Sequence, residues 1–129
     1  MMRAVLGLAA SVMAAPILAN GLWQVVKETP AEIISIERSD LQHGTGRVSF
    51  RERHVFRGRQ IDPDSLRPIR EILVKRMADC PGRRIATLSR AVFSDDDAMI
   101  NYRAVRPLHA EWLVMAKDDM TFRLVCGPL

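Results

Sequence analysis

Apolar and polar residues alternate with a period of two, rather than of 3.6, along most of the chain after position 20. The segment 47–57 shows this most clearly, because Val48, Phe50, His54 and Phe56 fall on one side of an extended backbone and arginines on the other. Such alternation is typical of a strand with one buried and one solvent-facing side. Turn residues separate further segments of the same kind. We therefore predict strands over 21–27, 32–39, 47–57, 71–80, 84–94, 99–106 and 111–116.

The turns and the C-terminal segment complete the predicted fold. The pair Pro81-Gly82 has the residue order of a type II turn, which makes the two strands around it a hairpin. Asp118 and Asp119 offer an N-cap for a short helix over 120–126. Its inward side would carry Phe122, Val125 and Cys126. The pattern predicts an α+β, mostly β fold: an antiparallel meander sheet of about six strands with one short C-terminal helix packed on it.

The first 19 residues have the layout of a secretory signal peptide. Arg3 precedes an apolar run, Pro16 interrupts it, and small residues follow. The run is too short to span a bilayer comfortably, although an uncleaved N-terminal anchor is the alternative. We expect a signal peptide over 1–19 and a single exported domain over 20–129, periplasmic or secreted from a bacterium. A cut nearer Ala14 or Ala15 stays open, and no further long apolar segment follows.

Cys80 and Cys126 are the only cysteines of the chain. Export implies an oxidising compartment, in which an even number of cysteines favours a disulfide. A buried pair of free thiols and a metal site are the alternatives. Two isolated cysteines without a neighbouring Cys-x-x-Cys or histidine pair are poor zinc ligands. We expect one disulfide, which would attach the C-terminal helix to the sheet.

Several segments resemble the surface-adhesin protein E-like family of small exported bacterial proteins. The resemblance is one of layout, covers nearly the whole exported part, and rests on Trp23, Asp79, Cys80, Arg84, Trp112 and Cys126. It implies a six-stranded antiparallel sheet with a C-terminal helix held by a Cys–Cys bridge. It also implies kinship with surface adhesins that bind host matrix proteins. This chain departs from a lipid-anchored adhesin, because no cysteine lies near the expected signal cut.

The sequence offers little for catalysis. His43, His54 and His109 lie in three different segments without metal-ligand spacing. A Gly-x-Ser-x-Gly elbow and a phosphate-binding glycine loop are both missing from the sequence. We therefore predict no enzyme activity, no metal and no cofactor. A small hydrolase is a third hypothesis, which requires His54 or His109 to meet an acid in space. A concave pocket with a histidine and a carboxylate would favour that hypothesis, and a flat basic face a binding module.

Charge adds one unusual feature. The 129 residues carry 19 basic and 15 acidic side chains, a net charge of +4. Between positions 41 and 90 there are 11 arginines and Lys75 against five acids, a net of +7. One predicted strand alone contributes Arg47, Arg51, Arg53 and Arg57. Guanidinium groups bind carboxylate, sulfate and phosphate bidentately, so this side of the sheet is a candidate binding face.

The resulting hypothesis is a non-catalytic exported interaction module that binds a protein or polyanionic envelope or host partner through its arginine-rich sheet face. An anionic glycan or lipid would also fit. Nucleic acid is not expected, because export separates the chain from it and stacking aromatics are few. The alternative is a periplasmic structural or envelope-stress factor with no dedicated ligand, in which the arginines only solubilise the sheet. Either way, we expect these arginines to add little to folding stability.

Overall fold

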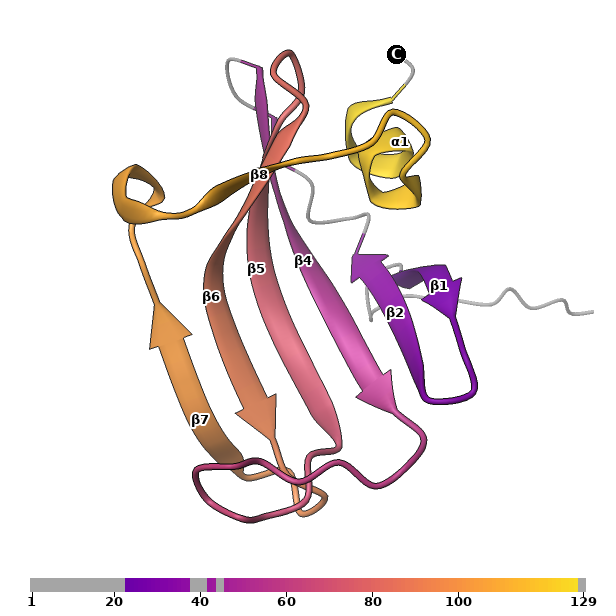
Figure 1. Ribbon diagram of the computed structural model, residues 1–129, viewed down its shortest axis with the longest axis vertical. Coiled ribbons are helices and arrows are strands. Elements are labelled where there is room, and N and C mark those ends of the chain that lie inside the picture. Colours follow the sequence, from indigo (N-terminus) through magenta and orange to yellow (C-terminus); the bar gives the residue numbers. More distant parts are fainter. Residues whose placement is uncertain (1–22, 38–41, 44–45, 128–129) are drawn as a thin grey trace, which may run out of the picture.

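The computed structural model describes residues 23–37, 42–43 and 46–127. The expected signal peptide and its cleavage site lie outside these residues and stay predictions. Among the described residues, no helix is long and apolar enough to cross a membrane. The elements, shown in Figure 1, are β1 (Trp23–Glu28), β2 (Glu32–Glu37), β3 (Gln42–His43), β4 (Arg47–Phe56), β5 (Glu71–Asp79), β6 (Arg84–Phe93), β7 (Met99–Ala104), a 3-10 turn (Pro107–His109), β8 (Trp112–Val114) and α1 (Met120–Cys126).

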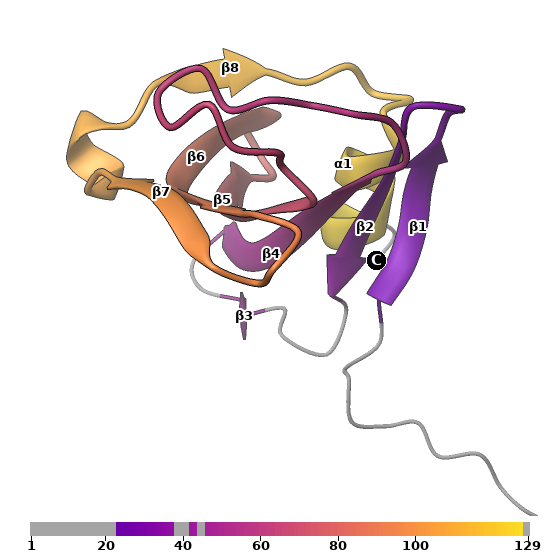
Figure 2. The same cartoon turned by 90° about the horizontal axis from the view of Figure 1, so that it is seen from below.

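The strands form one antiparallel sheet in the order β1-β2-β4-β5-β6-β7. This order is that of the predicted meander, and the predicted fold class is confirmed. Two short strands lie off this path. β3 pairs with β4, and β8 pairs with the start of β6, which β7 does not reach. The sheet is curved, with α1 on its inner side (Figure 2). The inner and outer sides therefore have different surroundings.

The inner side holds two separate hydrophobic clusters. One lies beneath α1 and is centred on Phe50 and Ile36, which are buried. The other consists of Ile72, Val74 and Val92, against which Ile69 of the 57–70 loop packs. A fully buried phenylalanine or isoleucine stabilises a fold by about 1.5–3 kcal/mol, so these clusters fix which side of the strands faces inward.

The helix α1 has seven residues, too few to be stable in isolation. The Asp119 carboxylate caps it by accepting hydrogen bonds from the backbone N–H groups of Thr121 and Phe122. Val125 is buried against the cluster under the helix. Cys126 is bonded to Cys80 at the end of β5, which confirms the expected disulfide and excludes the free-thiol and metal alternatives. Packing and one covalent bond together hold the helix in place.

The predicted type II turn at Pro81-Gly82 is wrong. The Cys80 carbonyl does accept a hydrogen bond from Arg83 N–H, at 3.2 Å, but the left-handed residue is Arg83, with a φ of 52°, and not Gly82. The reason is non-local, because the Arg83 carbonyl accepts from Met115 N–H at 2.8 Å. The Arg83 guanidinium also donates to the Met115 carbonyl, at 3.3 Å. Gly82 lies in a tight site, since a Cβ there would lie 2.8 Å from Asp79 Oδ2, and the Asp79 carboxylate would have to shift.

The disulfide should contribute a measurable share of the stability. It joins residues 46 positions apart, and closing a loop of that length is worth about 4 kcal/mol in the chain-entropy model. We predict that Cys126→Ser lowers the free energy of unfolding by about 2–5 kcal/mol in denaturant titrations. The Cys80→Ser variant and the double variant serve as controls and should lose the same amount, because all three lack the same bond. Two free thiols per unfolded, non-reduced parent chain would contradict this account.

Candidate functional site

Three of the four predicted arginines lie on the outer side of β4. Arg51 is opposite Glu37 of β2, and its Nε lies 2.9 Å from Glu37 Oε1. Glu37 is only 8% exposed, so Arg51 neutralises a carboxylate that has largely lost its water. Arg57 lies one residue past the strand and pairs with Glu28 near the β1–β2 turn.

The other two arginines stack on tryptophans. The Arg53 guanidinium carbon lies 4.4 Å from the centroid of Trp23, and that of Arg47 lies 5.0 Å from Trp112. All four predicted guanidinium groups are thus held by other groups of the chain. We expected these arginines to add little to folding stability. Arg51 should add more, because removing it would leave the buried Glu37 carboxylate without this partner.

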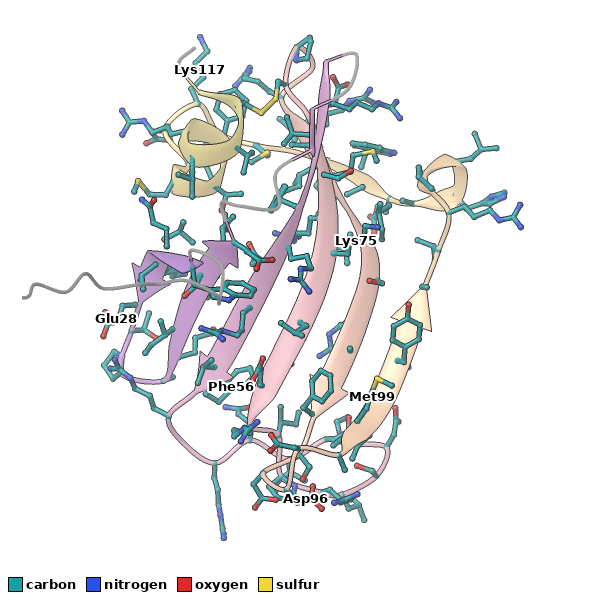
Figure 3. All side chains as sticks on the ribbon, turned by 180° about the vertical axis from the view of Figure 1, so that it is seen from behind. Glu28, Phe56, Lys75, Asp96, Met99 and Lys117 are labelled. Carbon is teal, nitrogen blue, oxygen red and sulfur yellow. A yellow bond between two sulfur atoms is a disulfide. The ribbon has the colours of Figure 1, made fainter. Side chains whose placement is uncertain are left out.

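The rest of the outer side is partly apolar and partly basic. Lys75 of β5 lies directly across from Arg51, is exposed, and has no polar partner in the described part of the chain. Cross-strand pairing forms a row from β4 to β7 on this side. The row consists of Arg53, Leu73, Ala91 and Tyr102, each paired with the next. Figure 3 views this side and shows no helix lying across β5 and β6.

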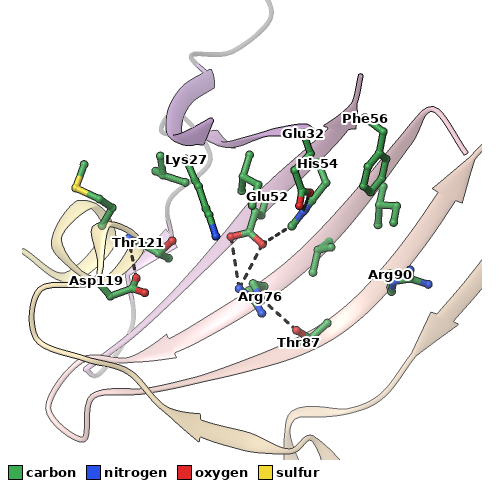
Figure 4. A pocket seen from close by; sticks show the side chains of 15 residues that line it. Lys27, Glu32, Glu52, His54, Phe56, Arg76, Thr87, Arg90, Asp119 and Thr121 are labelled. Carbon is green, nitrogen blue, oxygen red and sulfur yellow. Dashed lines mark hydrogen bonds and ion pairs between the residues drawn. The ribbon is translucent and has the colours of Figure 1, made fainter. Parts of the chain in front are cut away.

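The inner side contains a pocket of about 670 Å³ between the strands β1, β2, β4, β5 and β6 and the start of α1. Its wall carries a continuous chain of polar side chains from four adjacent strands, which we call the polar row (Figure 4). The polar row consists of Glu32 on β2, His54 and Glu52 on β4, Arg76 on β5 and Thr87 on β6.

Short contacts link every member of the polar row to the next. His54 Nδ1 lies 3.1 Å from Glu32 Oε2, and His54 Nε2 lies 2.9 Å from Glu52 Oε1. Arg76 Nη1 lies 3.3 Å from Glu52 Oε1. Arg76 Nε donates to Thr87 Oγ1 at 3.2 Å.

The strand register explains why these side chains meet. Glu52 pairs with Val74 and Phe50 pairs with Arg76, so Glu52 and Arg76 are diagonal neighbours on the inner side. Diagonal positions lie about 7–8 Å apart at Cα, within reach of long side chains. Arg76 and Thr87 are directly opposite one another. The polar row is therefore a product of pairing between distant segments.

Burial makes the pairing of Glu52 obligatory. Glu52 is only 4% exposed, and an unpaired buried carboxylate is strongly unfavourable. Its hydrogen bond is the largest cause that raises the pKa of His54 above 6.5; partial burial of the ring opposes this, and Glu32 reinforces it. A protonated His54 can donate from both ring nitrogens, one to each carboxylate. The ring thus acts as a cationic bridge between β2 and β4.

The polar row meets the geometric condition set for a hydrolase, since a pocket contains a histidine and carboxylates. Both nitrogens of His54, however, are occupied by Glu32 and Glu52, which leaves neither directed at a substrate. The described residues contain no group of three or more ligands suited to a metal ion. His109 is exposed and, within the described residues, meets no acid. The side chain of His43 lies outside the described part of the structure.

Sequence reasoning identified His54 but missed its partners. The missing signal was a charge at an inward position: Glu52 stands between Phe50 and His54 in the alternation, and Arg76 stands between Val74 and Ala78. A charge on the buried side of each of two central strands indicates that they neutralise one another.

Solved structures of protein E from Haemophilus influenzae have a similar fold. One matches with a TM-score of 0.57 and 14% identity over 88% of this chain and 90% of that chain. Crystal form II gives 0.57 and 14% over 91% and 96%, and the Se-Met form gives 0.56 and 15% over 88% and 92%. No protein-family model and no curated protein matches the sequence. The chain thus has a protein E-like fold, as its residue layout predicted.

The titration of His54 tests the polar row. We predict that the pKa of His54 lies above 6.5 in the folded chain, measured by NMR of the ring protons, and falls in Glu52→Gln. Because the folded pKa is raised, the stability from this contact is complete below about pH 6.5 and is lost as pH rises through the folded pKa. Glu111→Gln, at an exposed position, is the control and should leave the titration unchanged. An unaltered His54 pKa in Glu52→Gln would contradict the assigned contact.

Proposed function

We propose that the chain is a non-catalytic, exported binding module that holds an acidic protein partner on the outer side of its sheet. The observation that carries the proposal is the composition of this side. Basic groups flank an apolar strip, and no described helix crosses it. We define the outer strip as Leu73, Ala91, Phe93, Met99 and Tyr102.

The outer strip is unusual for a solvated sheet surface. Tyr102 is 58% exposed and Met99 is 57% exposed, while Leu73 and Phe93 are half-buried. Register places Phe93 beside Met99 and Ala91 beside Tyr102, so the strip is continuous over β6 and β7. Contiguous apolar surface rimmed by polar groups marks interaction sites. Aromatic residues, methionine and arginine are also those enriched at protein interfaces.

The arginines beside the outer strip are fixed by contacts within the chain before any partner binds. Stacking on Trp23 fixes Arg53, and pairing with Glu37 fixes Arg51, which still leaves its side chain 46% exposed. Fixing a guanidinium before binding lowers the entropy lost on binding. Lys75, which has no polar partner among the described residues, adds a positive charge between Arg51 and Ser89 of the neighbouring strands. Together these groups favour carboxylates on the partner's surface.

Two further observations bear on the choice of partner. The predicted basic groups are interrupted by Glu37 and Glu28, so they form no continuous row of free charges suited to a sulfated glycan. The resemblance to surface adhesins, drawn from the residue layout, also favours a protein partner. The second candidate function is a structural or envelope-stress factor with no dedicated ligand. It is favoured by the fact that the four arginines already have partners within the chain.

Binding of defined acidic polymers tests the proposal. We predict that the chain binds poly-L-glutamate and binds a glutamate–tyrosine copolymer more tightly, because tyrosine rings contact the outer strip. Arg53→Gln combined with Lys75→Gln should weaken both by tenfold or more, equal to about 1.4 kcal/mol, as measured by fluorescence anisotropy. Raising salt from about 50 to 200 mM should weaken binding as well. Tyr102→Ser should remove only the preference for the copolymer.

Lys117→Gln is the matched control, because Lys117 is an exposed lysine that does not belong to β5 or β6. It should bind both polymers as the parent does. Tighter binding of heparin than of either polymer would overturn the protein assignment. Equal binding by the parent and the double variant would favour the structural factor.

A further inference from the structure

We propose that the inner pocket is a binding site for a small amphipathic organic anion, with a carboxylate or phosphate head and an apolar body. The site lies on the opposite side of the sheet from the outer strip. It therefore goes beyond the proposed protein-binding function and does not depend on it.

The pocket has the size and lining of a small-molecule site. Its volume of about 670 Å³ is within the range of about 300–1,000 Å³ that such sites occupy. Apolar side chains from the sheet and from α1 line much of it, next to the polar row. They are Val26, Ile34, Phe56, Ile72, Val74 and Met120.

With His54 protonated, the pocket is lined by four cations (Lys27, His54, Arg76 and Arg90) and three carboxylates (Glu32, Glu52 and Asp119), a surplus of one positive charge. Within the polar row, Glu32 and Glu52 are balanced by protonated His54 and by Arg76. The Asp119 carboxylate, at the pocket's edge, is already accepting two backbone hydrogen bonds of α1.

Lys27 and Arg90 also line the pocket, and neither has a polar partner in the described part of the chain. Two unpaired cations over an apolar floor favour an anion that also carries an apolar body. A neutral or cationic amphiphile would leave the Lys27 ammonium without a counter-ion.

The arrangement of donors assigns the head of the ligand. Figure 4 shows Lys27 of β1 pointing toward the polar row, to which Arg76 of β5 belongs. Arg76 uses Nη1 for Glu52 and Nε for Thr87, and its Nη2 meets no acceptor among the described residues. The Lys27 ammonium and this Nη2 supply donors for the two oxygens of a carboxylate or phosphate.

The apolar body has a defined direction from that head. Ile34 of β2 pairs with Lys27 on one side and with His54 on the other, and His54 in turn pairs with Ile72. An apolar chain that starts at Lys27 therefore runs over Ile34, crosses the His54 ring and reaches Ile72. Arg90 lies at the far rim on β6, four strand spacings from β1, or about 19 Å along the curved sheet. Its charge adds to the attraction for anions without contacting the head directly.

Three dodecyl amphiphiles, kept below micelle-forming concentrations, test the site by calorimetry on the full chain. Dodecanoate and dodecyl phosphate should bind, and their relative affinity distinguishes a carboxylate from a phosphate head. Dodecyltrimethylammonium should not bind. We expect Lys27→Gln to weaken the anions by tenfold or more and Arg90→Gln by less. Lys75→Gln is the matched control, because it makes the same chemical change on the outer side, and it should bind as the parent does.

Several results would overturn the proposal. Equal binding of the ammonium amphiphile, an unchanged affinity in Lys27→Gln, or an equal loss in Lys75→Gln would each do so. If Lys27→Gln lowers the melting temperature, NMR of the parent decides. Dodecanoate must then shift the resonances of Ile72, Phe56 and His54 and leave those of Tyr102 in place. The two binding functions separate cleanly, because Lys27→Gln should leave poly-L-glutamate binding unchanged.

Discussion

The buried carboxylate of Glu52 is the constraint on which the inner side of this sheet depends. A charge with 4% exposure is tolerated only when cationic partners surround it, and here they are His54 on its own strand and Arg76 on the next. This requirement fixes the register of β4 against β5. It also places polar atoms between the two hydrophobic clusters, so that the inner side is not one continuous apolar core. The pocket occupies the interval between the clusters.

The two sides of the sheet consequently present different surfaces. On the inner side, α1, which the disulfide joins to the end of β5, lies over one end of the sheet and leaves a concave site of small-molecule size beside it. On the outer side, the same strands present fixed arginines beside exposed Tyr102. Alternation along β4 links the two, because each residue step moves from one side to the other. The strand β4 thus contributes Glu52 and His54 to the polar row and Arg51 and Arg53 to the outer side.

Local patterns predicted the fold well. The alternation in 47–57, the Asp119 cap and the pair of cysteines each depend on nearby residues or on simple pairing, and the meander, helix and bridge followed from them. Long-range contacts were beyond such reasoning. The left-handed residue of the β5–β6 turn is set by Met115, far along the chain. Glu52 and Arg76 meet only because the strands pair in one register, and Arg51 meets Glu37 for the same reason.

A double-mutant cycle on Glu52 and Arg76 tests the central claim most directly. The free energy of unfolding would be measured in denaturant for Glu52→Leu, Arg76→Leu and the combined variant. If the buried carboxylate organises the inner side, each single change is strongly destabilising, because it leaves an uncompensated charge. The combined variant should then recover part of the loss, with a coupling of about 1–3 kcal/mol. Losses that add within about 0.5 kcal/mol would contradict the account.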